Sequence, residues 1–165
     1  MPHYQAKLVL LGACLLLAGS VQAGVTVNFV RPDQFSDLPH APDQRQQALD
    51  DFAEHFRRLG EGLRPGQDLV IDVLDIDVAG REEPSRFGGD EIRVMRSGAE
   101  WPRMQLHYTL SENGRTLASG DAELADQNYR TRVSRYPNDA RWPYEMQMID
   151  DWWRRTIAPL GGGGR

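Results

Sequence analysis

The sequence predicts an α+β fold, a two-layer sandwich in which two amphipathic helices cover a largely antiparallel sheet. Residues 43–63 and 143–160 each carry apolar side chains at helical spacing. Residues 103–124 form two alternating runs joined by Asn113-Gly114, a dipeptide typical of a tight hairpin turn. Because each helix must bury its apolar stripe against something, the hairpin and the helices together indicate two packed layers.

The first two elements are a strand and a helix. Residues 25–30 are rich in β-branched side chains, and their alternation places Val25 and Phe29 on one face. Asp43 is a suitable N-cap for the helix, with Gln46 three residues later. The helix carries one apolar stripe along its length: Ala48, Leu49, Phe52, Phe56, Leu59 and Leu63.

Residues 69–78 form the most apolar strand, which predicts a central place in the sheet. In its second half, alternation places Leu74 and Ile76 on the core face and Asp75 and Asp77 on the other face. Residues 90–95 are compatible with a further short strand.

The hairpin strands and the last helix complete the domain. Residues 103–110 alternate, with His107 facing outward, and residues 115–124 form the returning strand. Pro143 occupies a first helical position. The order is therefore β-α-β-(β)-β-β-α, within a single α+β domain of residues 24–160, and residues 161–165 form a flexible Gly-rich tail.

Residues 1–23 have the pattern of a secretory signal peptide. Lys7 precedes a short apolar core, and small residues lead to a cleavage site between Ala23 and Gly24. The prediction is export to the periplasm, with no transmembrane segment in the mature chain. An alternative is an envelope lipoprotein anchored at Cys14, although cleavage there leaves a very short apolar core.

Composition excludes several kinds of chemistry. The chain has 165 residues, and its formal net charge of −5 becomes −6 (18 minus 24) when Lys7 is removed with the signal peptide. The mature chain then contains no Cys and no Lys, which excludes disulfides, thiolate nucleophiles and Schiff bases. The negative charge argues against nucleic acid as a partner.

Three stretches together resemble a known bacterial family. These are Val70 to Gly80, which contains Leu-Asp-Ile-Asp-Val-Ala-Gly; Leu106 to Gly120; and Ile149 to Arg155, which contains the Asp-Asp-Trp motif. They resemble the exported family catalogued as domain of unknown function 3016, and the resemblance runs from about Val25 to Pro159. Because that family has no assigned activity, the resemblance implies export and a domain boundary but no chemistry.

Two acids and a histidine are candidate metal or acid–base residues. Asp75 and Asp77 lie two residues apart on one strand face, and hard cations bind carboxylate oxygens. His107 is a candidate third group. The competing interpretation pairs the acids with arginines of neighbouring strands and leaves His107 on the surface. Ser119 lacks the Gly-x-Ser-x-Gly pattern of hydrolase nucleophiles.

Aromatic and basic residues near the C-terminus suggest an interaction surface. Tyr129, Arg130 and Trp152 are its candidate members, although Trp152 is equally compatible with packing onto the sheet. The sequence therefore favours a periplasmic, non-catalytic binding or interaction module without a cofactor, whose partner is an envelope protein or an anionic ligand. The alternative is a carboxylate-dependent metal-binding protein or hydrolase that uses Asp75 and Asp77.

Overall fold

The computed structural model describes residues 23–83, 92–95, 100–137 and 140–161. The predicted signal peptide apart from Ala23, its Cys14, and residues 162–165 of the predicted tail lie outside these ranges. The elements, in chain order, are β1 (Gly24–Phe29), η1 (Pro32–Gln34), α1 (Pro42–Gly60), β2 (Gln67–Asp77), β3 (Arg81–Glu83), β4 (Ile92–Val94), β5 (Arg103–Glu112), β6 (Arg115–Ala125), α2 (Pro143–Thr156) and α3 (Ala158–Gly161).

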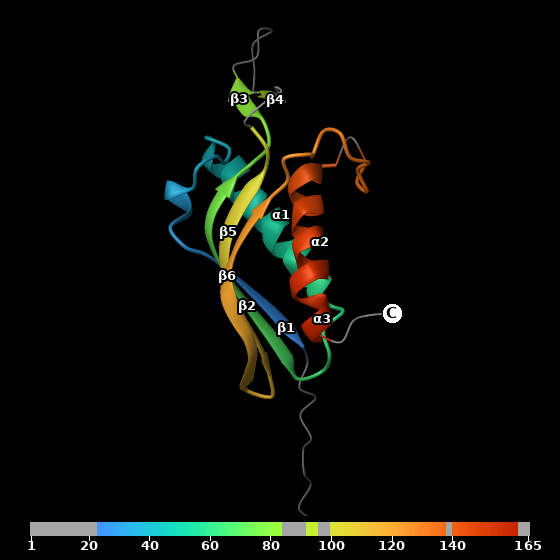
Figure 1. Cartoon of the computed structure of the whole chain (residues 1–165). Helices are drawn as coiled ribbons and strands as arrows, with labels where there is room; N and C mark the ends of the chain where they lie inside the picture. Colours follow the sequence, from blue (N-terminus) through green and yellow to red (C-terminus); the bar gives the residue numbers. More distant parts are fainter. Residues whose placement is uncertain (1–22, 84–91, 96–99, 138–139, 162–165) are drawn as a thin grey trace, which may run out of the picture.

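The main sheet has four strands in the order β1-β2-β5-β6, and it is open. The β1–β2 pair is parallel, whereas β2–β5 and β5–β6 are antiparallel. Helices α1 and α2 lie side by side on one face of this sheet (Figure 1). The predicted α+β fold, with a largely antiparallel sheet and two helices, is confirmed.

The short strands β3 and β4 form a separate antiparallel ribbon, which extends beyond the end of the main sheet (Figure 1). The predicted short strand at 90–95 corresponds to β4, with Asp90 and Glu91 outside the described residues. This ribbon matters for the site because Arg93 of β4 reaches back toward the helices.

The core lies between the sheet and the two helices. Phe52 and Phe56 of α1 and Ile149 of α2 are fully buried against the inner face of the sheet. Alternation predicts four inward residues in the first hairpin strand: Met104, Leu106 and Leu110 are at most 1% exposed, whereas Tyr108 is half-buried. Burial of each such side chain contributes about 1.5–3 kcal/mol, so this layer stabilises the fold.

Neither α1 nor α2 covers the opposite face of the sheet. The prediction that Leu74 of β2 faces the core is wrong. Leu74 is 44% exposed, although alternation placed it in the core with Ile76. The register shifts between Val73 and Asp75, so a bulge at Leu74 moves the inward position by one residue. Val70 is also 38% exposed, so β2 is central in the sheet but buried on only one face.

Both long helices begin at a proline. Helix α1 starts at Pro42, with Ala41 as its N-cap, so Asp43 lies in the first turn rather than at the predicted cap. Helix α2 starts at Pro143, as predicted. Within the described ranges, neither helix nor any other is long and apolar enough to cross a membrane.

Candidate binding site

A cavity that the described residues line lies where α2 begins. We call it the Trp142 cavity; its volume is about 640 Å³. It lies among β4, the start of α1 and the start of α2, and it combines aromatic, apolar and charged walls. The residues that line it are Pro39, Gln44, Glu82, Arg93, Met95, Ala140, Arg141, Trp142, Pro143, Tyr144 and Glu145. A concave, partly apolar space with a few polar groups is the usual form of a ligand site.

Arg93 carries the strongest polar signal in this cavity. Its Nη1 donates to Asp37 Oδ2 at 3.0 Å, and its guanidinium lies 5.7 Å from the Trp142 ring centroid. Its Nη2 is buried and has no hydrogen-bond partner among the described residues, because Glu82 Oε1 is 3.7 Å away. A buried donor without a hydrogen-bond acceptor is rare in native proteins, so this atom is a candidate contact for a ligand.

Glu145 fixes the floor of the cavity. It occupies the first turn of α2, and its Oε1 accepts a hydrogen bond from the Ala79 backbone N–H at 2.6 Å. Complete burial raises the pKa of Glu145, although hydrogen bonds from the backbone N–H groups of Ala79 and of Glu145 itself oppose the shift. Burial likewise raises the pKa of Asp37 against the opposing effect of Arg93.

Trp142 is held in place from α1. It is the N-cap of α2 and adopts a left-handed backbone conformation (φ 58°). Its Nε1 donates to Asp51 Oδ2 at 3.2 Å, and its ring lies 5.7 Å from that of Phe52. The aromatic wall of the cavity is therefore positioned before any ligand binds.

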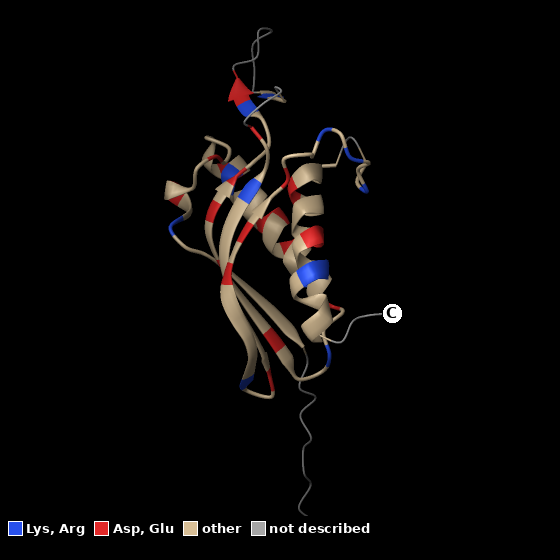
Figure 2. Ribbon diagram, viewed as in Figure 1, with Lys and Arg blue, Asp and Glu red and all other residues tan. Residues whose placement is uncertain are grey.

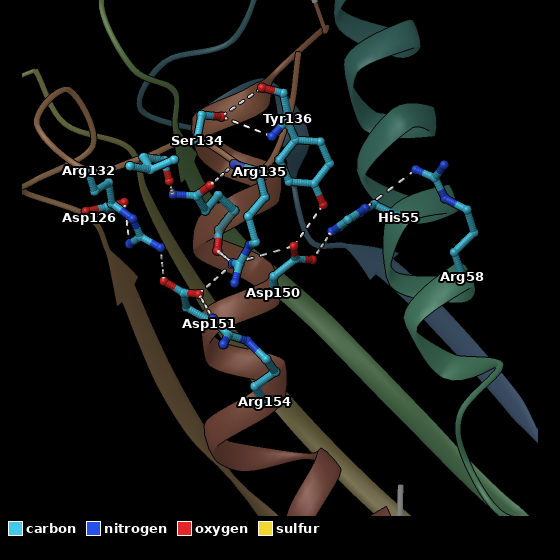
Figure 3. A network of polar contacts seen from close by, with 12 residues as sticks. His55, Arg58, Asp126, Arg132, Ser134, Arg135, Tyr136, Asp150, Asp151 and Arg154 are labelled. Carbon is cyan, nitrogen blue, oxygen red and sulfur yellow. Dashed lines mark hydrogen bonds and ion pairs between the residues drawn. The ribbon is translucent and has the colours of Figure 1, made fainter. Parts of the chain in front are cut away.

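A second polar site lies further along α2, and we call it the Asp151 cluster (Figure 3). Figure 2 shows acidic and basic residues beside one another on α2, with further basic residues in the loop before it. The cluster joins α1, α2 and the loop that follows β6, and its members are His55, Arg58, Asp126, Arg132, Arg135, Tyr136, Asp150, Asp151 and Arg154.

Asp151 is the centre of this cluster. Arg132 and Arg154 donate to its two carboxylate oxygens, and Arg135 donates to Oδ1 at 2.8 Å. Burial opposes ionisation of Asp151, but the three arginine hydrogen bonds outweigh it and lower its pKa to about 2. Arg132 also donates to Asp126 Oδ2 at 2.8 Å, and these bonds to Asp151 and Asp126 raise the pKa of Arg132.

His55 of α1 also belongs to the cluster. The sequence analysis missed this residue. It is only 4% exposed, and its Nε2 lies 2.8 Å from Asp150 Oδ1. His55 follows Phe52 by three residues, which places it on the buried stripe of the helix. Tyr136 OH donates to Asp150 Oδ2 at 2.9 Å, and burial together with this bond raises the pKa of Tyr136.

His107 faces the open side of the sheet, as predicted, but its partners are on β6. Its Nδ1 lies 2.6 Å from Asp121 Oδ1, and its Nε2 lies 3.1 Å from Ser119 Oγ. This connectivity resembles an acid–imidazole–hydroxyl relay. However, the Asp121 side chain is 85% exposed, and backbone N–H groups within a β-ladder bond to neighbouring strands rather than to a substrate oxyanion.

The structure does not bring Asp75, Asp77 and His107 together. Asp75 accepts hydrogen bonds at 2.7 Å from both the backbone N–H and the hydroxyl of Ser36. Asp77 forms an ion pair with Arg103, as the competing interpretation expected for this acid. Among the residues that the structure describes, no group of three or more His, Cys, Asp or Glu side chains is arranged to hold a metal ion.

Two of the three predicted surface residues are buried. Tyr129 is 6% exposed and Trp152 is 5% exposed, so neither offers a free surface; Arg130 is exposed. The Trp152 ring lies 5.7 Å from Tyr108 and 6.1 Å from Phe56, so it packs between the sheet and α1. The expectation that Trp152 packs onto the sheet is therefore confirmed, and its placement on an interaction surface is wrong.

The fold and its sites thus define a small α+β protein with a helix-covered sheet and a cavity at the start of its last long helix. The family model described as protein of unknown function (DUF3016) matches residues 23–155, and the chain belongs to this family. No curated protein matches the chain. Among solved structures, it is similar to the crystal structure of protein XCC0632 from Xanthomonas campestris, of family model DUF330. The identity is 17%, the match covers 87% of this chain and 83% of that chain, and the TM-score is 0.34.

Proposed function

We propose that this protein is an exported, periplasmic binding module that does not catalyse a reaction, and that the Trp142 cavity holds its ligand. The observation that carries the proposal is the buried Nη2 of Arg93 at the wall of a 640 Å³ cavity, which forms no hydrogen bond with the described residues and lies 3.7 Å from Glu82 Oε1. The chemistry of the walls specifies the ligand: a hydrogen-bond-accepting oxygen for Arg93, carried on an apolar body that contacts Trp142 and Tyr144.

The polar groups around the cavity suit binding better than catalysis. Arg93 holds Asp37, and Glu145 holds the backbone of Ala79, so each charged group already has a structural bond. A general acid or base must exchange a proton with a substrate within hydrogen-bond reach, whereas Arg93 joins β4 to the loop after η1 and Glu145 joins α2 to the backbone that follows β2. The cavity therefore supplies shape and a donor, Arg93 Nη2, that forms no hydrogen bond within the described part of the chain.

Thermal unfolding of residues 24–165 with small organic acids tests the ligand site. Benzoate and hexanoate are expected to raise the Tm, and acetate at the same concentration is expected to raise it less, because it lacks an apolar body. At ten times Kd the stabilisation is about 1.4 kcal/mol, or roughly 5 °C for a domain of this size.

One exposed position gives a matched pair of variants for this experiment. Gln44 lies at the start of α1 and lines the cavity without forming a hydrogen bond with the described residues. Gln44→Trp fills the space and should abolish the Tm increase, whereas Gln44→Ala leaves the cavity open and should retain it. An equal Tm increase in both variants, or none with any acid in the wild-type protein, would contradict the assignment of this cavity.

The location is tested by sequencing the N-terminus of the protein isolated from its native cells. We expect Gly24 as the first residue, in the periplasmic fraction, because the predicted cleavage site follows Ala23. An acylated Cys14 would instead establish the lipoprotein alternative. Intact residues 1–23 on protein from the cytoplasmic fraction would refute export.

A further inference from the structure

We propose that a second pocket, between α1 and α2, binds a phosphate-type oxyanion. This pocket has a volume of about 420 Å³ and adjoins the Asp151 cluster (Figure 3). Four of the side chains that line it are cationic or can become so: His55 and Arg58 from α1, Arg135 from the preceding loop and Arg154 from α2. The site goes beyond the proposed function, since none of its lining residues contributes to the Trp142 cavity.

The arginines retain donors for a ligand. Among the described residues the Arg58 side chain has no carboxylate partner, and its one hydrogen bond joins Nη2 to His55 Nδ1 at 3.5 Å. Arg135 and Arg154 contact Asp151 through Nη2. In the described part of the chain, no contact involves Nη1 or Nε of these two residues, so two edges of planar guanidinium remain for anion oxygens.

Asp150, the acid that lines the pocket, competes for these arginine donors less than Asp151 does. Asp150 Oδ1 lies 2.8 Å from His55 Nε2, and its Oδ2 accepts from Tyr136 OH at 2.9 Å. Both carboxylate oxygens are thus bonded to uncharged or titratable partners, and the nearest arginine atom, Arg135 Nη2, is 3.7 Å away. The bonds from His55 and Tyr136 hold the carboxylate against the wall of the pocket.

The local charge is opposite in sign to that of the whole chain. The Asp151 cluster contains four arginines against Asp126, Asp150 and Asp151, a surplus of one positive charge with His55 neutral. The full sequence carries a formal net charge of −5. The pocket is lined by planar guanidinium groups from three segments, and several such groups suit the several acceptor oxygens of a phosphate.

Titration with inorganic phosphate, at constant ionic strength maintained with NaCl, tests the site. Adjacent residues on α1 provide a matched pair of variants. Arg58 lines the pocket, whereas Arg57 does not and its Nη1 lies 3.6 Å from Glu54 Oε2. We expect phosphate to bind the wild-type protein and Arg57→Gln with equal affinity. It should bind Arg58→Gln about tenfold more weakly, because a charge-assisted hydrogen bond is lost.

A second pair of variants, on α2, tests the site without changing any residue of α1. Arg154→Gln should weaken phosphate binding and Arg155→Gln should not, because only Arg154 lines the pocket. Thermal melts without phosphate identify any variant that is merely destabilised. No binding of phosphate by the wild-type protein, or equal affinity for Arg58→Gln and Arg57→Gln, would overturn the proposal, and neither result bears on the Trp142 cavity.

Two arms of the experiment distinguish the sources of the phosphate group. Glycerol 1-phosphate represents a soluble ester, and vesicles of phosphatidylglycerol in phosphatidylcholine represent a lipid headgroup. If the wild-type protein sediments with these vesicles and Arg58→Gln does not, the phosphate group is that of a lipid headgroup. Binding of glycerol 1-phosphate without sedimentation would identify a soluble ligand. Both outcomes support the oxyanion site, whereas failure of both probes would contradict it.

Discussion

Replacing Asp151 with Asn is expected to lower the stability of the protein by about 3 kcal/mol. The Asp151 side chain is 9% exposed and accepts hydrogen bonds from Arg132, Arg135 and Arg154. Asn keeps the size but removes the charge, which leaves three guanidinium groups without their shared partner. Because these arginines are partly exposed, water compensates for some of the loss, and the cost is at the lower end for a broken buried pair.

The same carboxylate is expected to make the fold sensitive to acid. Its pKa is about 2 in the folded protein, below the ordinary value near 3.8, so the unfolded chain binds a proton at higher pH than the folded chain does. The resulting stabilisation of about 2 kcal/mol is present above about pH 5 and is lost as the pH falls toward 2.

Urea unfolding of the wild-type protein and of Asp151→Asn, at pH 7 and at pH 3, measures both effects. The difference in unfolding free energy between the two proteins should narrow at pH 3, because the wild-type carboxyl is already mostly protonated in the unfolded state but still ionised in the folded state. Asp50→Asn is the control, since Asp50 is exposed on α1 and accepts only from Gln46 among the described residues. A difference that is the same at both pH values would show that Asp151 is not held as an ion.

The elements of this fold were predictable because their signals are local. Helix α2 begins at Pro143 and the hairpin turns at Asn113-Gly114, and each of these depends on neighbouring residues alone. Details that depend on register were not predictable. A two-residue turn with regular pairing would place Gly120 opposite His107, but a shift between Leu110 and Ser111 places Asp121 there instead.

The candidate sites depend on contacts between distant segments, and these leave only weak traces in a sequence. Arg93 meets Asp37 across 56 residues, and Glu145 meets Ala79 across 66. Neither pair has a characteristic spacing. His55 is different, because its position three residues after Phe52 indicates burial, and a buried histidine in a helix needs a polar partner. The Asp-Asp-Trp motif at residues 150–152 provides that partner as well as the centre of the Asp151 cluster.

Replacing Trp152 with Ala is expected to have the largest effect of any variant considered, a loss of about 4 kcal/mol in unfolding free energy. The ring lies between Phe56 of α1, Tyr108 of β5 and its neighbour Trp153, with centroid distances of 5.7–6.3 Å. Alanine would leave a cavity where the helix layer meets the sheet, and close packing on all sides limits how far the surroundings can collapse into it.

A second substitution at this position separates packing from hydrogen bonding. Trp152 Nε1 is buried and has no hydrogen-bond partner among the described residues. Trp152→Phe loses part of the apolar contact but also removes this unsatisfied donor, so the two effects oppose each other and the net cost should be about 1 kcal/mol or less. Arg130→Ala, an exposed position of the predicted interaction surface, should change stability by at most about 0.5 kcal/mol. Urea unfolding of the three variants should therefore rank Trp152→Ala far above the others. If Trp152→Ala and Arg130→Ala lower the unfolding free energy by similar, small amounts, Trp152 is not part of the core and its prediction as a surface residue stands.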